Sequence, residues 1–149
     1  MVVGWADRYV FYALHLEDNQ FILLINGETI MEKMLKEFIL IFRMDITTKE
    51  AQPTPAQMEV YMKQWEEWIN DIALQNKLAD GGNHLTSEGR VIKPNNVIKE
   101  EPYTVSRETI AGYILIKVEN LDEALDLAKA CPILQGEGTS VEVREVSAM

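Results

Sequence analysis

The segment EFILIFR, Glu37–Arg43, decides the fold of this chain. It is a short continuous run rich in Phe and Ile, a composition typical of a β-strand. Side chains alternate across a strand, and here both alternating sets are apolar. One face carries Phe38, Leu40 and Phe42, and the other carries Ile39 and Ile41. Both faces of this strand must therefore be covered in the folded protein.

Two later segments have the pattern of strands in the same sheet. Gly112–Val118 (GYILIKV) is again apolar on both faces, and Ser140–Val146 (SVEVREV) alternates as a half-buried strand does. Asn83–Ile92 is a weaker candidate for another strand. Pro94-Asn95-Asn96 marks a turn, after which Val97–Glu101 could pair with that candidate.

A helix is predicted between the first two strands. Thr54 has the position of an N-cap, Pro55 that of the first helical residue, and Gln57 that of a capping box. We expect the helix to run to about Lys77 and to stop before Gly81-Gly82. Its predicted buried stripe, at helical 3/4 spacing, is Met58, Tyr61, Met62, Trp65, Ile69 and Ile72. Trp68 lies one position off this stripe, so a contact with a loop or a partner subunit is expected for it.

A second helix is predicted before the last strand. Asn120 is its N-cap, Glu123 is at the capping-box position, and Cys131-Pro132 ends it. Its expected buried stripe is Leu121, Ala124, Leu125 and Ala128.

The order β-α-β-β-α-β predicts an α+β, ferredoxin-like fold. In this arrangement a four-stranded antiparallel sheet carries both helices on one face. The other face would expose the apolar residues of the two central strands as a patch that monomers rarely tolerate. We therefore predict a homodimer in which the two sheets pack face to face.

Residues 1–33 differ from the rest of the chain. Two apolar runs, Tyr9–Leu16 and Phe21–Ile25, flank a polar tetrad that could turn a hairpin. Both runs are shorter than the roughly 18 apolar residues of a membrane helix. We interpret 1–33 as an N-terminal extension, or as an over-extended gene start, in front of a core domain at 34–149.

The charge balance restricts the partners. Fourteen basic residues against 24 acidic ones give a formal net charge of −10. Nucleic acids and anionic membranes usually bind proteins of the opposite balance, so we expect neither as a partner. The single cysteine, Cys131, excludes an internal disulfide, and two histidines are too few for a closed Cys/His zinc site. The composition predicts a cytoplasmic, soluble protein, and no motif calls for a cofactor or a metal.

Several motifs follow one another in a specific order. Trp65 and Trp68 are followed by Gly81-Gly82 and then by Leu85. Next come Glu100-Glu101-Pro102-Tyr103, Arg107-Glu108, Gly112-Tyr113, Leu121-Asp122-Glu123-Ala124, Cys131-Pro132 and Val141-Glu142-Val143-Arg144. In this order, residues 34–146 resemble the YCII-related family, in the DGPF-type branch that is named after its Asp-Gly-Pro-Phe signature. The resemblance implies the dimeric α-β barrel fold.

The chain departs from the family pattern at two points. The Asp-Gly half of the signature is Glu100-Glu101 here, so Glu101 stands where a glycine could adopt a positive φ. A shorter branch of the family has a His in the first helix and an Asp in the following loop, proposed as a catalytic pair. The first helix here has no histidine, and that proposal does not transfer.

His84 and Glu100 are the candidate catalytic residues. The pKa of an unperturbed histidine suits proton transfer, and a carboxylate can act with it as acid or base. The alternative for His84 is an exposed loop histidine. Arg43, Arg107, Glu108 and Tyr103 are candidates for substrate contacts. The alternative for the cluster around Pro102 is a structural ion pair, and for Arg43 simple solvation.

Two functional classes follow from these residues. One is a small lyase- or isomerase-like enzyme that uses acid/base chemistry on a compact, perhaps aromatic, compound in a pocket at the dimer interface. The other is a non-catalytic module that binds a small ligand or has a regulatory role. A cavity that joins His84 to a carboxylate would favour the enzyme, and a cavity filled by apolar side chains would favour the module.

Overall fold

The computed structural model describes residues 2–6, 9–16, 20–25, 28–45, 48 and 52–147. The chain divides into two compact units, Met1–Lys36 and Glu37–Met149. The first unit holds a sheet of four antiparallel strands in sequential order. These strands are β1 (Val2–Ala6), β2 (Tyr9–Leu16), β3 (Gln20–Ile25) and β4 (Glu28–Lys33). The two apolar runs of the sequence lie in β2 and β3, and the idea of an over-extended gene start stays a prediction.

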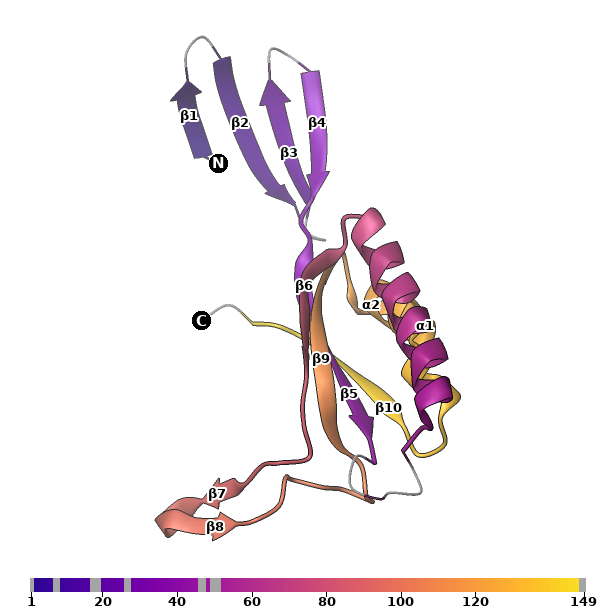
Figure 1. The fold of residues 1–149 in the computed structure, drawn as a ribbon. Helices are drawn as coiled ribbons and strands as arrows, with labels where there is room; N and C mark the ends of the chain where they lie inside the picture. The colour runs from indigo at the N-terminus through magenta and orange to yellow at the C-terminus, as the bar shows by residue number, and fades with distance from the viewer. Residues whose placement is uncertain are drawn as a thin grey trace. The chain divides into compact units, whose positions relative to one another are not determined.

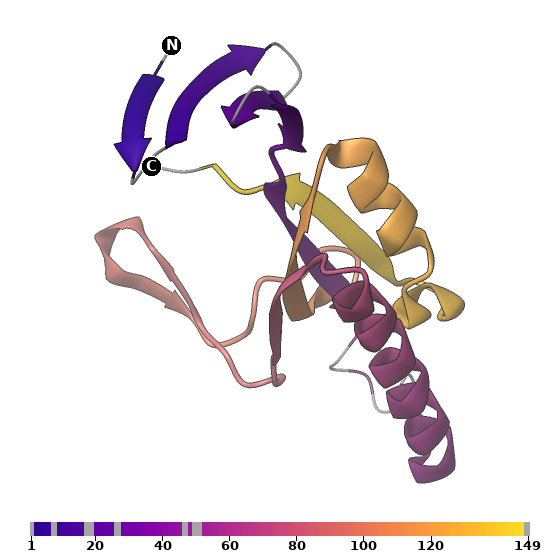
Figure 2. The same ribbon diagram turned by 90° about the horizontal axis from the view of Figure 1, so that it is seen from above.

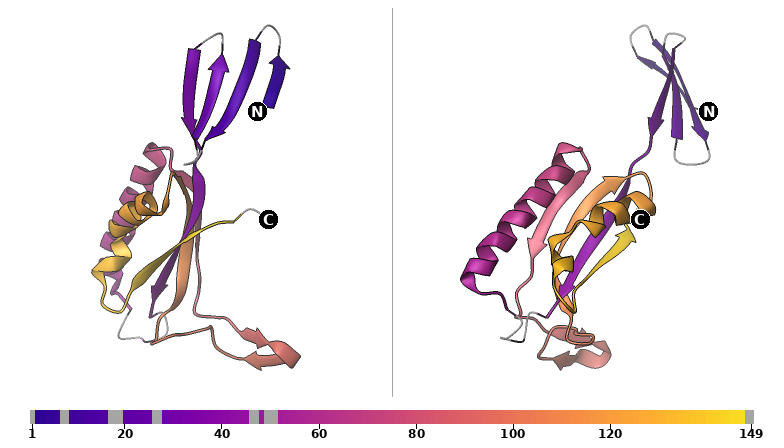
Figure 3. Two further views of the ribbon diagram at one scale, coloured as in Figure 1. Left: turned by 180° about the vertical axis from the view of Figure 1, so that it is seen from behind. Right: turned by 90° about the vertical axis from the view of Figure 1, so that its right-hand side faces the viewer.

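The second unit has the predicted ferredoxin-like arrangement, with two helices on one face of a four-stranded antiparallel sheet (Figures 1 and 3). The strand order is β10-β5-β9-β6. Its elements are β5 (Lys36–Met44), α1 (Pro55–Leu74), β6 (Leu78–His84), β9 (Thr109–Val118), α2 (Leu121–Lys129), a 3₁₀ turn at Pro132–Gln135 and β10 (Ser140–Glu145). The segment that decides the fold is thus a central strand, with β9 and β10 on its two sides.

The core lies between the sheet and the helices, as the alternation in β5 predicts. Phe38, Leu40 and Phe42 are buried, and Ile39 and Ile41 on the opposite face are half-buried. The core is completed by Ile114, Ile116 and Val118 from β9, by Trp65, Trp68 and Ile72 from α1, by Ala124 and Ala128 from α2, and by Cys131 and Ile133.

Helix α1 begins as predicted but buries a different stripe. Thr54 Oγ1 accepts from the Gln57 N–H, and the Gln57 side chain accepts from the Thr54 N–H, so the capping box is complete. The prediction for Trp68 was wrong, because this side chain is in the core and its Nε1–H donates to the Leu127 carbonyl oxygen at 3.1 Å. Met58 and Met62 are about half exposed, not buried, because the first half of α1 borders a cavity.

Helix α2 also begins as predicted, and part of its predicted stripe was wrong. The Asn120 side chain accepts from the Glu123 N–H at 2.9 Å, which caps the first turn. Ala124 and Ala128 are buried as expected, whereas Leu121 and Leu125 are exposed. Leu127 packs against the core in their place. The buried face is therefore rotated slightly from the predicted one.

Strand β6 contains the glycine pair. The weaker strand candidate at Asn83–Ile92 is confirmed only at its two ends, because Asn83 and His84 belong to β6, Val91 and Ile92 belong to a separate strand, β7 (Val91–Lys93), and residues 85–90 are not strand. The register between β6 and β9 shifts on both sides of Asp80, so the strand is bulged. Gly82 has φ +60°, and its N–H donates to Asp80 Oδ1 at 2.7 Å. A Cβ at Gly82 would lie 1.6 Å from the Tyr113 carbonyl oxygen. Only glycine allows β6 to approach β9 this closely.

A β-arm extends from the sheet between β6 and β9. It consists of β7 (Val91–Lys93), the turn Pro94–Asn96 and β8 (Val97–Lys99), and the two strands pair with Ile92 opposite Ile98. Figure 2 shows this arm projecting away from the helices. The predicted pairing across the Pro94–Asn96 turn is confirmed, with β8 ending at Lys99.

The glycine pair provides a matched test of the bulge. We expect Gly82→Ala to lower the free energy of unfolding by more than about 2 kcal/mol, because the new Cβ meets a backbone carbonyl and φ stays positive. Gly81→Ala should change it by less than about 1 kcal/mol, because in the described part of the chain no atom beyond its two sequence neighbours lies within 4 Å of its Cβ position. Urea unfolding of both variants measures this, and equal losses would contradict the role given to Gly82.

Candidate functional site

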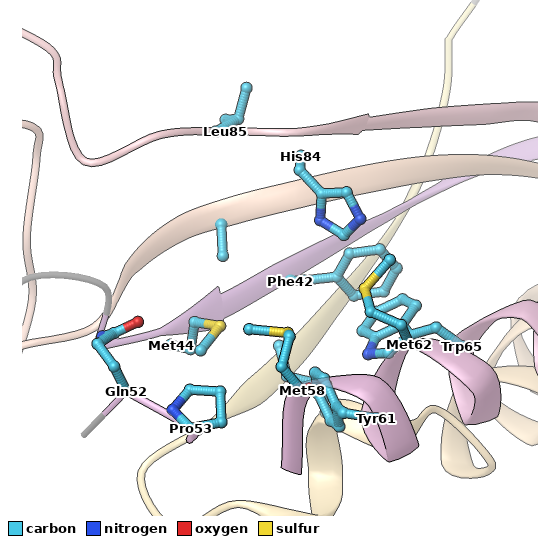
Figure 4. Close-up of a pocket in the computed structure, with 12 residues that line it drawn as sticks. Phe42, Met44, Gln52, Pro53, Met58, Tyr61, Met62, Trp65, His84 and Leu85 are labelled. Carbon is cyan, nitrogen blue, oxygen red and sulfur yellow. The ribbon is translucent and has the colours of Figure 1, made fainter. Parts of the chain in front are cut away.

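A cavity of about 270 Å³ lies between the first half of α1 and the ends of β5 and β6 (Figure 4). We call it the α1 cavity. It is lined by Phe42, Met44, Gln52, Pro53, Met58, Tyr61, Met62, Trp65, His84, Leu85, Ala111 and Ile133. Its volume is slightly below the range for small-molecule sites, which is roughly 300–1,000 Å³, so it suits only a compact ligand.

The lining of the α1 cavity is apolar and uncharged at its centre. Met44, Met58 and Met62 contribute flexible, polarisable side chains that adapt to different shapes. No Lys, Arg, Asp or Glu is among the described residues that line it. Gln52, Tyr61 and His84 bring polar side-chain atoms to the wall. Such a lining suits a compact ligand that is mostly apolar and carries no charge.

Trp65 organises the aromatic wall of the cavity. The ring of Phe42 lies 4.7 Å from it, that of Tyr61 6.0 Å and that of His84 6.3 Å, measured between centroids. All three contacts are edge-to-face, an arrangement that aromatic pairs prefer. Trp68 packs against Trp65 from the core side at 5.4 Å. The indole of Trp65 is thereby fixed at the boundary between the core and the cavity.

The polar edge of Trp65 is buried without a hydrogen bond. Its Nε1 has no hydrogen-bond partner within the described part of the chain. Burial raises the pKa of the Tyr61 hydroxyl, and the neighbouring Trp65 N–H partly offsets that rise. The N–H thus lies near the Tyr61 oxygen but does not meet it with hydrogen-bond geometry.

The structure places His84 at the mouth of the α1 cavity. The residue ends β6 directly after the glycine bulge, opposite Gly112 of β9. Its side chain is exposed, and Figure 4 shows the ring turned toward Phe42 and Trp65. This is the helix-covered side of the sheet and not the open face where we expected the pocket. Across 52–147, a stretch described without a gap, His84 makes no hydrogen bond or ion pair with a carboxylate.

Glu100 lies beside the β-arm and not at the α1 cavity. It follows the β-arm and pairs with Arg90 at 2.6 Å, with both side chains more than two-thirds exposed. It lines a second cavity of about 450 Å³ together with Tyr103, Lys93 and Lys99. Glu100 does not line the α1 cavity, so a single chain does not bring the two predicted catalytic residues together.

The other predicted contact residues are spread over the open face and its edge. Arg43 donates to Glu142 across β5 and β10 at 3.0 Å. Glu108 accepts a hydrogen bond from the Ser140 hydroxyl at 3.0 Å.

Arg107 and Tyr103, the other two predicted contact residues, lie in the segment that leads into β9. Arg107 lies in a tight turn with φ +70°, closed by hydrogen bonds between Val105 and Glu108. Within the described residues, Glu101 is not among those with positive φ. The backbone at this position therefore does not require the glycine that the sequence resemblance placed there. Tyr103 is exposed, and its carbonyl accepts from Thr109 Oγ1 at 3.0 Å.

Sequence reasoning missed most residues of the α1 cavity, because His84 alone among its lining was a candidate site residue. Met58, Tyr61 and Met62 were assigned to the core because they share the spacing of the buried stripe. That spacing is the same whether a helix face packs on a sheet or borders a hollow. Met58 and Met62 lie one turn apart in the first half of the helix, and this pair was the available signal for a cavity. Methionine is frequent at adaptable binding surfaces.

Cys131 is a structural residue beneath α2. It is 2 % exposed, and burial raises the pKa of its thiol to about 12. The thiolate, which is the reactive form, is therefore almost absent at neutral pH.

A thiol assay tests the burial of Cys131. Since the sequence has one cysteine, a disulfide reagent such as DTNB at pH 8 should react very slowly with native protein. The same protein in guanidinium chloride should release one equivalent of chromophore at once. A fast reaction of the native protein would contradict both the burial and the raised pKa.

The described residues contain no group of three His, Cys, Asp or Glu side chains placed to hold a metal ion. None of the helices described is long and apolar enough to cross a membrane.

Comparison with known proteins identifies the family. No curated protein matches the sequence. The model of the YCII-related domain matches residues 51–147. This range starts after β5, later than the resemblance over 34–146 that the motifs indicated, and it contains both helices, the β-arm, β9 and β10. Assignment to the DGPF-type branch stays a prediction. Because the match covers well over half of the chain, the protein belongs to the YCII-related family.

Proposed function

We propose that the protein is a small-ligand-binding module whose site is the α1 cavity. The observation that carries this proposal is a hollow lined by methionines and aromatic rings, with no charged side chain among the described residues that line it. A folded core normally fills such a space, because each missing contact costs stability. The occupant that matches this lining is a compact, neutral, largely apolar molecule.

Entry to the cavity is open without a change of the backbone. Met58 and Met62 are 40% and 47% exposed, so they lie at the rim and not in the packed core. An unbranched thioether side chain has several accessible rotamers and can move aside at low cost. His84 is exposed at the same rim and offers one polar contact to a bound molecule.

Catalysis by His84 and Glu100 has less support. A general base needs its partner within about 2.6–3.2 Å or one water, and Glu100 lies outside the cavity that His84 borders. Carboxylates of Glu59 and Glu66 line a groove that His84 also borders, on the outer side of Met62 and Trp65. Neither of them is joined to His84 by a hydrogen bond within residues 52–147.

Ligand binding can be tested with ethylbenzene as the probe. In protein labelled with ¹³C at its methionine methyl groups, we expect ethylbenzene to shift the signals of Met44, Met58 and Met62, because an aromatic ring in the cavity lies against them. Ala111→Phe should abolish the shifts by filling the cavity. The control Ala130→Phe makes the same change at an exposed helix end and should keep them. If the three signals stay in place in the wild-type protein, this site does not bind apolar ligands.

We also propose that two chains associate through the open face of the β10-β5-β9-β6 sheet. Ile39, Ile41, Tyr113 and Leu115 are only half-buried there. They form an apolar centre beside the Arg43–Glu142 ion pair. Covering them with a second copy would remove this surface from water.

The association can be tested by analytical ultracentrifugation. The wild-type protein should sediment as a dimer at micromolar concentration, and Ile41→Lys should sediment as a monomer, because it puts a charge at the centre of the interface. Leu125→Lys, which changes an exposed position on α2, should remain a dimer. A monomeric wild-type protein would refute the proposal.

A further inference from the structure

The N–H of Trp65 is the one feature of the α1 cavity that the packing of the chain does not explain. The side chain is 6% exposed, and Nε1 is buried without a hydrogen-bond partner among the described residues. Buried polar groups in native proteins are nearly always hydrogen-bonded, and an orphan donor needs an explanation. An indole nitrogen is a donor only, so what it lacks is an acceptor.

The second tryptophan of the helix shows that the fold does not force a buried indole N–H to lack a hydrogen bond. Trp68 lies one turn further along α1 and is buried to the same degree. Its Nε1–H donates to the Leu127 carbonyl oxygen at 3.1 Å. Among the described residues, the core therefore supplies an acceptor to Trp68, whose N–H points toward α2, whereas the neighbouring Tyr61 oxygen does not meet the Trp65 N–H with hydrogen-bond geometry.

The surroundings of the Trp65 nitrogen limit what can meet it. Figure 4 shows the nitrogen on the edge of the indole that faces Met58 and Tyr61. The nitrogen has almost no accessible surface in the free protein, so an incoming atom reaches it when a flexible neighbour such as Met58 moves. The Tyr61 hydroxyl lies close by and can donate to the same acceptor.

We infer that the ligand of the α1 cavity is a neutral aromatic compound with a carbonyl oxygen, which accepts a hydrogen bond from Trp65 Nε1–H. The inference rests on the binding function proposed above and adds the class of ligand. The apolar lining binds the aromatic ring, and the unpaired N–H selects the acceptor. A carboxylate is a poorer match, because no Lys or Arg is among the described residues that line the cavity.

Acetophenone and ethylbenzene test this inference as a pair, because they have nearly the same shape and only acetophenone has an acceptor. We expect acetophenone to bind about three- to tenfold more tightly, the range for one net hydrogen bond. In ¹⁵N-labelled protein, acetophenone should move the Trp65 indole Hε1 signal downfield. The signal of Trp68 should stay in place, because its N–H is already paired with Leu127.

The outcomes separate this inference from the proposed function. If both compounds shift the methionine signals equally and the Trp65 indole signal does not distinguish them, the cavity binds apolar ligands but the inference is overturned. If neither compound binds, both proposals fail. Benzoate should bind more weakly than acetophenone, and tighter binding of benzoate would also overturn the choice of a neutral ligand.

A variant gives a second measurement. Trp65→Phe keeps an aromatic ring but removes the N–H, so it should bring the affinities for acetophenone and ethylbenzene to within about twofold of each other. The comparison is made within one variant, so a general loss of affinity from the smaller ring cancels. A selectivity for acetophenone that persists in this variant would show that another group supplies the hydrogen bond.

Discussion

The close approach of β6 to β9 at Gly82 is the constraint on which the site depends. The Gly82 backbone comes so near the Tyr113 carbonyl oxygen that no side chain fits between them. The hydrogen bond from the Gly82 N–H to Asp80 stabilises the bulge from within the strand. Because a bulge changes which face the next residues occupy, it determines that His84 lies on the helix side of the sheet, at the mouth of the cavity. Without it, His84 and Leu85 would not close this end of the hollow.

A second constraint is the unequal covering of the sheet by α1. The second half of the helix packs closely through Trp68 and Ile72, whereas the first half leaves a space that side chains only partly fill. The capping box at Thr54 fixes the position at which the helix begins, and with it the placement of Met58 and Tyr61. The same helix thus forms core at one end and borders the α1 cavity at the other.

The parts of the fold that follow from local patterns could be predicted, and the parts that depend on packing could not. Alternation in β5, the capping box of α1 and the turn at Pro94–Asn96 are local, and each is present as expected. The glycine pair was interpreted as a stop signal for the helix. A Gly-Gly pair looks the same in the sequence whether it follows a helix or lies where two strands approach closely, so the approach of β6 to β9 could not be predicted from it. Met58 and Met62 were placed in the core because helical spacing identifies a face but not what covers it. Glu100 and His84 are near in sequence, yet the β-arm carries Glu100 to another surface.

Trp65 and Trp68 differ in how their polar atoms are satisfied, although they lie one turn apart on the same helix. Both are buried and both pack edge-to-face on Phe42, although helical spacing placed only Trp65 on the predicted buried stripe. The difference lies in the polar atom: the N–H of Trp68 has a backbone acceptor, and that of Trp65 has no hydrogen-bond partner among the described residues. An unpaired donor costs roughly 1–3 kcal/mol, so a chain selected for stability alone would place Phe or Leu at this position. The ligand proposed above would account for an indole at this position, because it would complete the hydrogen bond that the described part of the chain does not supply.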